Sequence, residues 1–212
     1  MTIGINRGSL ILDKQPKDDM TLPEIAGLNR DQVLTLMNSR SYKQYCDGIE
    51  AYLKGKCIFC DPLGPKNKVL FETDGGEHAW RVWENPFPLK RTSRHLIMAP
   101  VQHLTDPNLI TRWDWIKQGE IWLYARDVLG IKGGACVGRF GSPEFNAGSI
   151  LHLHTNIIVP DGTGDVQITV GKSPEKMELI ARRVVVFEKL RTGTSRLEDL
   201  SPEELELVDG RI

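Results

Sequence analysis

The 212-residue chain has no apolar run that approaches the roughly 20 residues of a membrane-spanning helix. Its formal net charge is only −1, so no general attraction to nucleic acid or to an anionic membrane is expected. The first residues, MTIGINRGSLILDKQ, contain no basic segment followed by a long apolar core, and we therefore expect no secretory signal. These absences argue against membrane and nucleic-acid partners.

Cysteine and histidine are scarce, with four and five residues respectively. Four cysteines in a chain of this length do not suggest a disulfide scaffold, so a reducing, cytoplasmic setting is expected. The apolar content of 40% is enough for the core of one large domain, or of one domain with an extension.

Apolar spacing and start and stop signals predict four helices, of which the third has Ser173 as N-cap and Gly193 as its end. The helices are expected over residues 29–55, 106–130, 174–192 and 201–208. Short β-rich segments bounded by turns predict strands over 69–73, 78–85, 94–100, 134–140, 150–160 and 166–171.

Consecutive strands with helices set apart favour an α+β fold with an antiparallel sheet, a long helix and a C-terminal helix. We expect three parts. They are a helical N-terminal extension over 1–55, a central domain over 56–192, and a C-terminal tail with a short helix over 193–212.

The stretch GSILHLHTNIIVP, residues 148–160, places three polar side chains on one face of an apolar strand. Side chains alternate along a strand, so His152, His154 and Asn156 share one face. The other, mostly apolar face holds Leu151, Leu153, Thr155, Ile157 and Val159. This pattern indicates either a site or an open sheet face with two solvated histidines.

The stretch CIFCDP spaces Cys57 and Cys60 so that both thiolates can reach one metal ion. A redox pair usually precedes a helix, whereas Asp61-Pro62 follows here, which favours a tetrahedral metal site over a redox pair. A chance pair is the remaining alternative. The other ligands of a metal site would be histidines from elsewhere. In SRHLIMAPVQHLTD, His95 begins a strand and His103 follows its end, where each is either a ligand or a surface residue.

Along the chain, the motifs follow the order thiol pair, strand with His95 and His103, helix, Gly-Ser loop and His-x-His. In this order they resemble the histidine triad (HIT) superfamily of nucleotide hydrolases and transferases, over roughly residues 57–160. The chain departs from the simple His-x-His-x-His motif at Asn156. The branch that resembles galactose-1-phosphate uridylyltransferases and dinucleoside tetraphosphate phosphorylases has a glutamine there, which is also an amide. The departure favours nucleotidyl transfer to an acceptor other than water.

The resemblance implies that His154 attacks an α-phosphorus and forms a nucleotidyl-histidine, with the carbonyl of His152 orienting its ring and Asn156 beside it. These three are the expected catalytic residues. The loop before the strand is expected to hold phosphate through Asn146, Gly148 and Ser149, although an ordinary loop is the alternative. The expected nucleoside-binding residues are Trp83, Glu84 and Asn85, although aromatics in such a strand are more often core.

The resemblance also implies a structural zinc ion. Its expected ligands are Cys57, Cys60, His103 and His152. A homodimer through the tryptophan-rich helix before Gly130 is a further expectation, with packing of that helix on its own sheet as the alternative. Two other functions remain open, a hydrolase that uses water on dinucleoside polyphosphates or nucleoside phosphoramidates, and a nucleotide-binding protein without catalysis.

Overall fold

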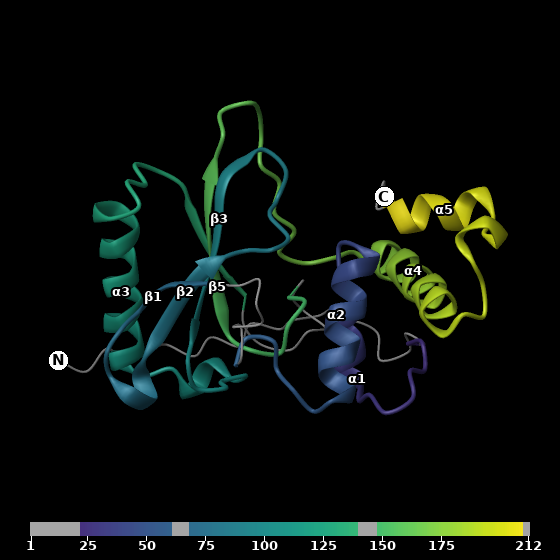
Figure 1. Cartoon of the computed structure of the whole chain (residues 1–212), viewed down its shortest axis with the longest axis horizontal. Coiled ribbons are helices and arrows are strands. Elements are labelled where there is room, and N and C mark those ends of the chain that lie inside the picture. The colour runs from purple at the N-terminus through teal and green to yellow at the C-terminus, as the bar shows by residue number, and fades with distance from the viewer. Residues whose placement is uncertain (1–21, 61–67, 140–147, 210–212) are drawn as a thin grey trace, which may run out of the picture.

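The computed structural model describes residues 22–60, 68–139 and 148–209, and Figure 1 shows the arrangement of their helices and strands. One antiparallel sheet holds five strands in the order β1-β2-β3-β5-β4. The strands are β1 (Val69–Glu72), β2 (Trp80–Glu84), β3 (Thr92–Pro100), β4 (Ala135–Arg139) and β5 (His154–Pro160). The predicted α+β class with an antiparallel sheet is confirmed.

Helix α3 (Arg112–Asp127) covers one face of the sheet (Figure 1). Its residues Ile121 and Ala125 pack against alternate residues of three central strands. Because side chains alternate along β5, Ile157 enters this core while its neighbours Asn156 and Ile158 lie on the opposite face. The strand register therefore separates a structural face from a face that is available for a site.

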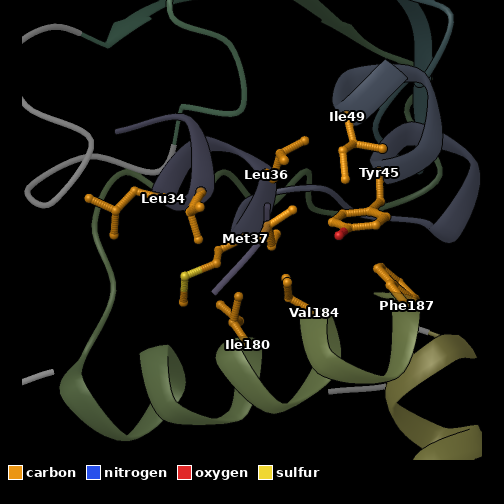
Figure 2. Packing of buried hydrophobic residues seen from close by; sticks show 10 residues of the cluster. Leu34, Leu36, Met37, Tyr45, Ile49, Ile180, Val184 and Phe187 are labelled. Carbon is orange, nitrogen blue, oxygen red and sulfur yellow. The ribbon is translucent and has the colours of Figure 1, made fainter. Parts of the chain in front are cut away.

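The other helices form a group beside the sheet, made of α1 (Arg30–Met37), α2 (Tyr42–Leu53), α4 (Pro174–Thr192) and α5 (Pro202–Asp209) (Figure 1). Figure 2 shows their common core, in which residues of α1 and α2 face α4. The buried side chains labelled there are Leu34, Leu36, Met37, Tyr45, Ile49, Ile180, Val184 and Phe187. Full burial of such a side chain contributes about 1.5–3 kcal/mol, so this core joins the two ends of the described chain.

The single helix predicted over 29–55 is wrong, because the chain forms two helices with a break between Met37 and Tyr42. Asn38 caps the C-terminus of α1, and the Ser41 side chain accepts a hydrogen bond from the backbone of Gln44 at 3.2 Å. Asparagine and serine hydrogen-bond readily to nearby backbone, which favours helix ends over helix interiors. The spacing of apolar residues over 29–55 does not reveal hydrogen bonds of this kind, so it predicted one continuous helix.

Two predicted strands differ from the structure. The strand over 150–160 begins only at His154, and residues 166–171 form no strand. The latter segment instead passes close to the edge strand β4, where Thr169 O accepts two hydrogen bonds from the Arg139 guanidinium at 2.9 and 3.2 Å. This side-chain contact takes the place of the backbone hydrogen bonds that a strand over 166–171 would form with a neighbouring strand.

Helix signals at the C-terminal side are confirmed. Ser173 caps the N-terminus of α4, and Gly193 ends the helix in the left-handed region at φ 74°. Ser201 and Glu204 exchange the two hydrogen bonds of a capping box, at 3.0 and 3.2 Å.

The helix predicted over 106–130 starts later than expected, because Pro107–Leu109 forms a 3-10 turn before α3. None of the described helices combines the length and apolar character needed to cross a membrane.

Gly134 lies where β4 approaches β5, and a Cβ atom there would come within 2.5 Å of the Ile158 carbonyl oxygen. We expect Gly134→Ala to push β4 away from β5 and to lower the free energy of unfolding by about 1–3 kcal/mol, measured by urea denaturation. Gly133→Ala is the matched control, because no atom lies within 4 Å of its Cβ position. Equal stability of the two variants would contradict this account of the β4–β5 contact.

Candidate functional site

Four side chains from three segments meet near the start of β5, namely Cys57, Cys60, His103 and His152. Their ligand atoms all lie within 4.8 Å of one another. The sulfur-to-nitrogen distances are 3.1 Å from Cys60 to His103, 3.4 Å from Cys57 to His152 and 3.6 Å from Cys60 to His152. In a tetrahedral site with metal–sulfur and metal–nitrogen bonds of about 2.3 and 2.0 Å, this distance is about 3.5 Å. The cluster therefore fits one tetrahedral ion.

The ring of His152 is already oriented for ligation. Its Nε2 atom lies 3.0 Å from the Pro100 carbonyl oxygen, which can only accept, so Nε2 carries the proton and Nδ1 presents a lone pair to the thiols. Burial and the neighbouring Cys57 raise the pKa of the Cys60 thiol to about 12. A thiolate at this position therefore requires a cation beside it, and these residues could hold a metal ion.

His154 begins β5 and lies half-buried at a cavity on the sheet face opposite α3. Its Nδ1 atom donates to the carbonyl oxygen of His152 at 2.7 Å, which leaves the lone pair on Nε2. Burial lowers the pKa of His154 to about 4, and the ring is therefore neutral at pH 7. No residue in the described ranges hydrogen-bonds to its Nε2 atom, so the lone pair is available to a ligand.

Asn156, two residues along the same face, is buried and fixed by His95. The Leu89 backbone donates to His95 Nδ1 at 3.0 Å, so the neutral ring carries its proton on Nε2 and donates it to Asn156 Oδ1 at 2.9 Å. The amide nitrogen of Asn156 then points the other way, 3.4 Å from the Val137 carbonyl oxygen. Sequence reasoning gave His95 no such role, although its place in the strand motif was visible.

The cavity has a volume of about 680 Å³ and lies between the free face of the sheet and the helical group. Trp83 and Asn85, two of the expected nucleoside-binding residues, line this cavity together with His154 and Asn156. Glu84 does not line it, and its carboxylate lies 3.8 Å from Arg94. Trp83 is almost fully buried, with its ring edge-on to Phe59 at a centroid distance of 5.2 Å.

The segment before β5 is held by the helical group. Asn38 donates to the carbonyl oxygen of Gly148 at 2.6 Å, and Gln44 donates to the Ser149 hydroxyl at 3.3 Å. Asn146, the third residue expected to bind phosphate, lies outside the described residues. Sequence reasoning assigned no role to Asn38 or Gln44, because the contact spans 110 residues and leaves no local pattern.

The arrangement provides one neutral imidazole with a free ring nitrogen, one oriented amide and a cavity of nucleotide size. An imidazole in this state can act as a nucleophile or can accept a hydrogen bond from a ligand. The cluster of Cys57, Cys60, His103 and His152 lies on the side of the His152 ring that faces the thiols. It offers four protein ligands, which leaves no open position for a substrate in a tetrahedral site. The two centres therefore have different chemistry and share His152.

No protein-family model matches the chain, and no curated protein matches it. Among solved structures, the chain is similar to a HIT-like protein at 22% identity, with a TM-score of 0.39, covering 51% of this chain and 94% of that one. It is similar to a zinc-bound histidine triad family protein from Mycobacterium smegmatis at 17% identity and TM-score 0.38, covering 65% and 96%. It is also similar to the diadenosine triphosphate hydrolase of Plasmodium falciparum, solved in complex with cyclomarin A, at 17% identity and TM-score 0.32, covering 61% and 88%.

Proposed function

We propose that this chain is a histidine triad-like enzyme that acts at the α-phosphate of a nucleotide through a covalent intermediate on His154. One observation carries the proposal. The Nδ1 proton of His154 is held by the carbonyl oxygen of His152 at 2.7 Å, while Nε2 is left free beside the cavity. The low pKa of this ring, about 4, supports the proposal because the imidazole need not lose a proton before it attacks.

The reaction proceeds in two displacements. Nε2 of His154 donates its electron pair to the α-phosphorus, and the bond from phosphorus to the leaving oxygen breaks with its electron pair going to that oxygen. An acceptor oxygen then bonds to the phosphorus, loses its proton to solvent or a base, and returns the N–P electron pair to Nε2. The hydrogen bond to the His152 carbonyl stabilises the positive charge that the ring gains in the intermediate.

Asn156 determines the kind of leaving group in this proposal. Its amide nitrogen can donate a hydrogen bond to a phosphoryl oxygen, but an amide cannot supply a net proton. The leaving group must then depart as a stable anion, which a phosphate does and an amine does not. This supports a nucleoside polyphosphate or nucleotide-sugar substrate over a phosphoramidate. An amide in place of a third histidine also favours an acceptor other than water.

His154→Ala tests the covalent step. We expect brief incubation with Ap4A, ADP-glucose and UDP-sugars to give a nucleotide-sized adduct on the wild-type chain with at least one of them, and none on the variant, by intact-protein mass spectrometry. Nucleotide binding by the variant should remain, because the cavity is otherwise intact. His78→Ala is the control, since this histidine lies near Asp114 on the α3 side of the sheet. Full turnover by His154→Ala contradicts the proposal.

We also propose that the metal cluster holds a structural zinc ion. Two thiolates and two imidazoles form a closed tetrahedral site of the kind that zinc prefers. Bound there, zinc would supply the positive charge that keeps the two thiols deprotonated. His152 would link this ion to the site, because its ring faces the thiols and its carbonyl accepts from His154.

Metal analysis tests the zinc proposal. We expect about one zinc ion per wild-type chain, and its loss with lowered thermal stability in Cys60→Ser and His152→Ala, because three ligands hold the ion less tightly than four. Cys136→Ser should keep the ion, since Cys136 is exposed on β4 away from the cluster. If wild-type protein prepared without chelator contains no metal, the zinc proposal is wrong.

A homodimer through α3 is the third part of the proposal. Trp113, Trp115 and Trp122 are 55%, 63% and 41% exposed on this helix, although its opposite side packs on the sheet. Aromatic side chains are enriched in interface cores. We expect light scattering at micromolar concentration to give about twice the 23.9 kDa chain mass, and Trp115→Glu to lower it toward the monomer. A monomer mass for the wild-type chain excludes a stable dimer.

A further inference from the structure

Positive side chains gather on the cavity that His154 faces, in a chain whose net charge is only −1. Among the described residues, six lysines and arginines line it, against a single carboxylate, that of Asp47. The six are Arg40, Lys90, Arg139, Lys172, Lys176 and Arg183. Asp47 is itself paired with Lys43 at 2.6 Å, so it does not neutralise them.

Four of these cations, which we call the cation cluster, come from β4, from α4 and from the segment before α4. They are Arg139, Lys172, Lys176 and Arg183. Within the described ranges, Arg139 donates to the Thr169 carbonyl oxygen, and Arg183 donates to two carbonyl oxygens at and just after the end of α1, at 2.6 and 3.3 Å. No carboxylate of the described residues forms an ion pair with any of the four. Backbone carbonyls orient a guanidinium but do not cancel its charge.

Holding these groups together is unfavourable without an anion. The Nε atom of Arg183 is buried and has no hydrogen-bond partner in the described structure. Burial, and then the charges of Arg183, Lys176 and Arg139, lower the pKa of Lys172 to about 7. A half-buried lysine surrounded by three other cations is destabilised unless a ligand supplies negative charge, and such arrangements are typical of binding sites.

The cation cluster adjoins the nucleophile. Arg139 is the direct partner of His154 in the register of β4 and β5, and its charge contributes to the lowered pKa of that histidine. From Arg139 the cluster continues past Lys172 to α4, on the wall of the cavity opposite the sheet. A ligand with its α-phosphorus at His154 would therefore extend its further negative charges toward α4.

We propose that the cation cluster binds the phosphate-bearing group that is exchanged at His154. This inference rests on the proposed function. The acceptor in the second displacement enters on the side from which the leaving group left, so one subsite serves both. The group accepts hydrogen bonds from the ammonium and guanidinium groups and leaves, or attacks, through a phosphate oxygen. The substrate class is then a nucleotide with at least one further phosphate beyond the α-phosphate.

Binding of inorganic tripolyphosphate, measured by isothermal titration calorimetry on the full chain, tests the subsite without any chemistry. We expect Lys172→Gln and Lys176→Gln each to weaken binding by roughly tenfold, the worth of one charge-assisted hydrogen bond. Lys132→Gln, an exposed lysine outside the cavity, should bind like the wild-type chain. Lys172→Arg should retain binding because the charge is kept. Tripolyphosphate that does not bind, or that binds the glutamine variants as tightly as the wild-type chain, overturns the inference.

A substrate comparison shows what the cluster does in the reaction. Lys172→Gln should slow adduct formation from ATP or Ap4A, but not from the p-nitrophenyl ester of AMP, whose leaving group departs as a stable anion but carries no phosphate. It should also slow discharge of a preformed adduct by inorganic phosphate. Equal slowing with both kinds of leaving group overturns the inference. The proposed function fails in a different way, since no adduct would then form on the wild-type chain with any substrate while tripolyphosphate binding persisted.

Discussion

The hydrogen bond from Nδ1 of His154 to the carbonyl oxygen of His152 fixes which nitrogen of the half-buried imidazole carries its lone pair. The other contacts of the site hold His152, and with it this hydrogen bond, in place. The ring of His152 is held by the Pro100 carbonyl on one side and faces the two thiols on the other. Since the backbone carbonyl of the same residue accepts from His154, a metal ion bound by the His152 ring would also restrict the movement of His154. The cysteine–histidine cluster and His154 are thus linked through a single residue, His152.

The helical group completes the site from the side that faces away from α3. The sheet supplies the face of β5 that carries His154 and Asn156, while α1, α2 and α4 border the cavity on its other side, and α4 adds two of its cations, Lys176 and Arg183. The core shared by α1, α2 and α4 keeps this wall in place (Figure 2). The contact from Asn38 to Gly148 ties the same helices to the segment that leads into β5. Recognition of the exchanged group would thus depend on residues far from the histidine motif.

Those parts of the site that depend on local spacing were predictable from the sequence. Alternation along one strand predicted that His154 and Asn156 share a face, and the spacing of Cys57 and Cys60 predicted that both thiols meet in one cluster. Caps at Ser173 and Gly193 predicted the ends of α4. In each case a few neighbouring residues determine the geometry.

Features that arise from distant contacts were not predictable in this way. The role of His95 in fixing Asn156 depends on the pairing of β3 with β5 across 61 residues. In the cation cluster, Arg139 lies near Lys172 and Arg183 because α4 packs against α1 and α2. The break between α1 and α2 escaped the apolar periodicity, because Asn38 and Ser41 act through hydrogen bonds to the backbone. The division of the chain at residues 55 and 192 stays a prediction.

The central claim is that two displacements occur at one phosphorus, with His154 between them. Its most direct test is the stereochemical course at an α-phosphorus made chiral with sulfur, followed by phosphorus NMR of the product from a nucleotide that turns over. Each in-line displacement inverts the phosphorus, so transfer through His154 predicts net retention of configuration. Net inversion would show that the acceptor attacks the substrate directly, and would contradict the covalent account.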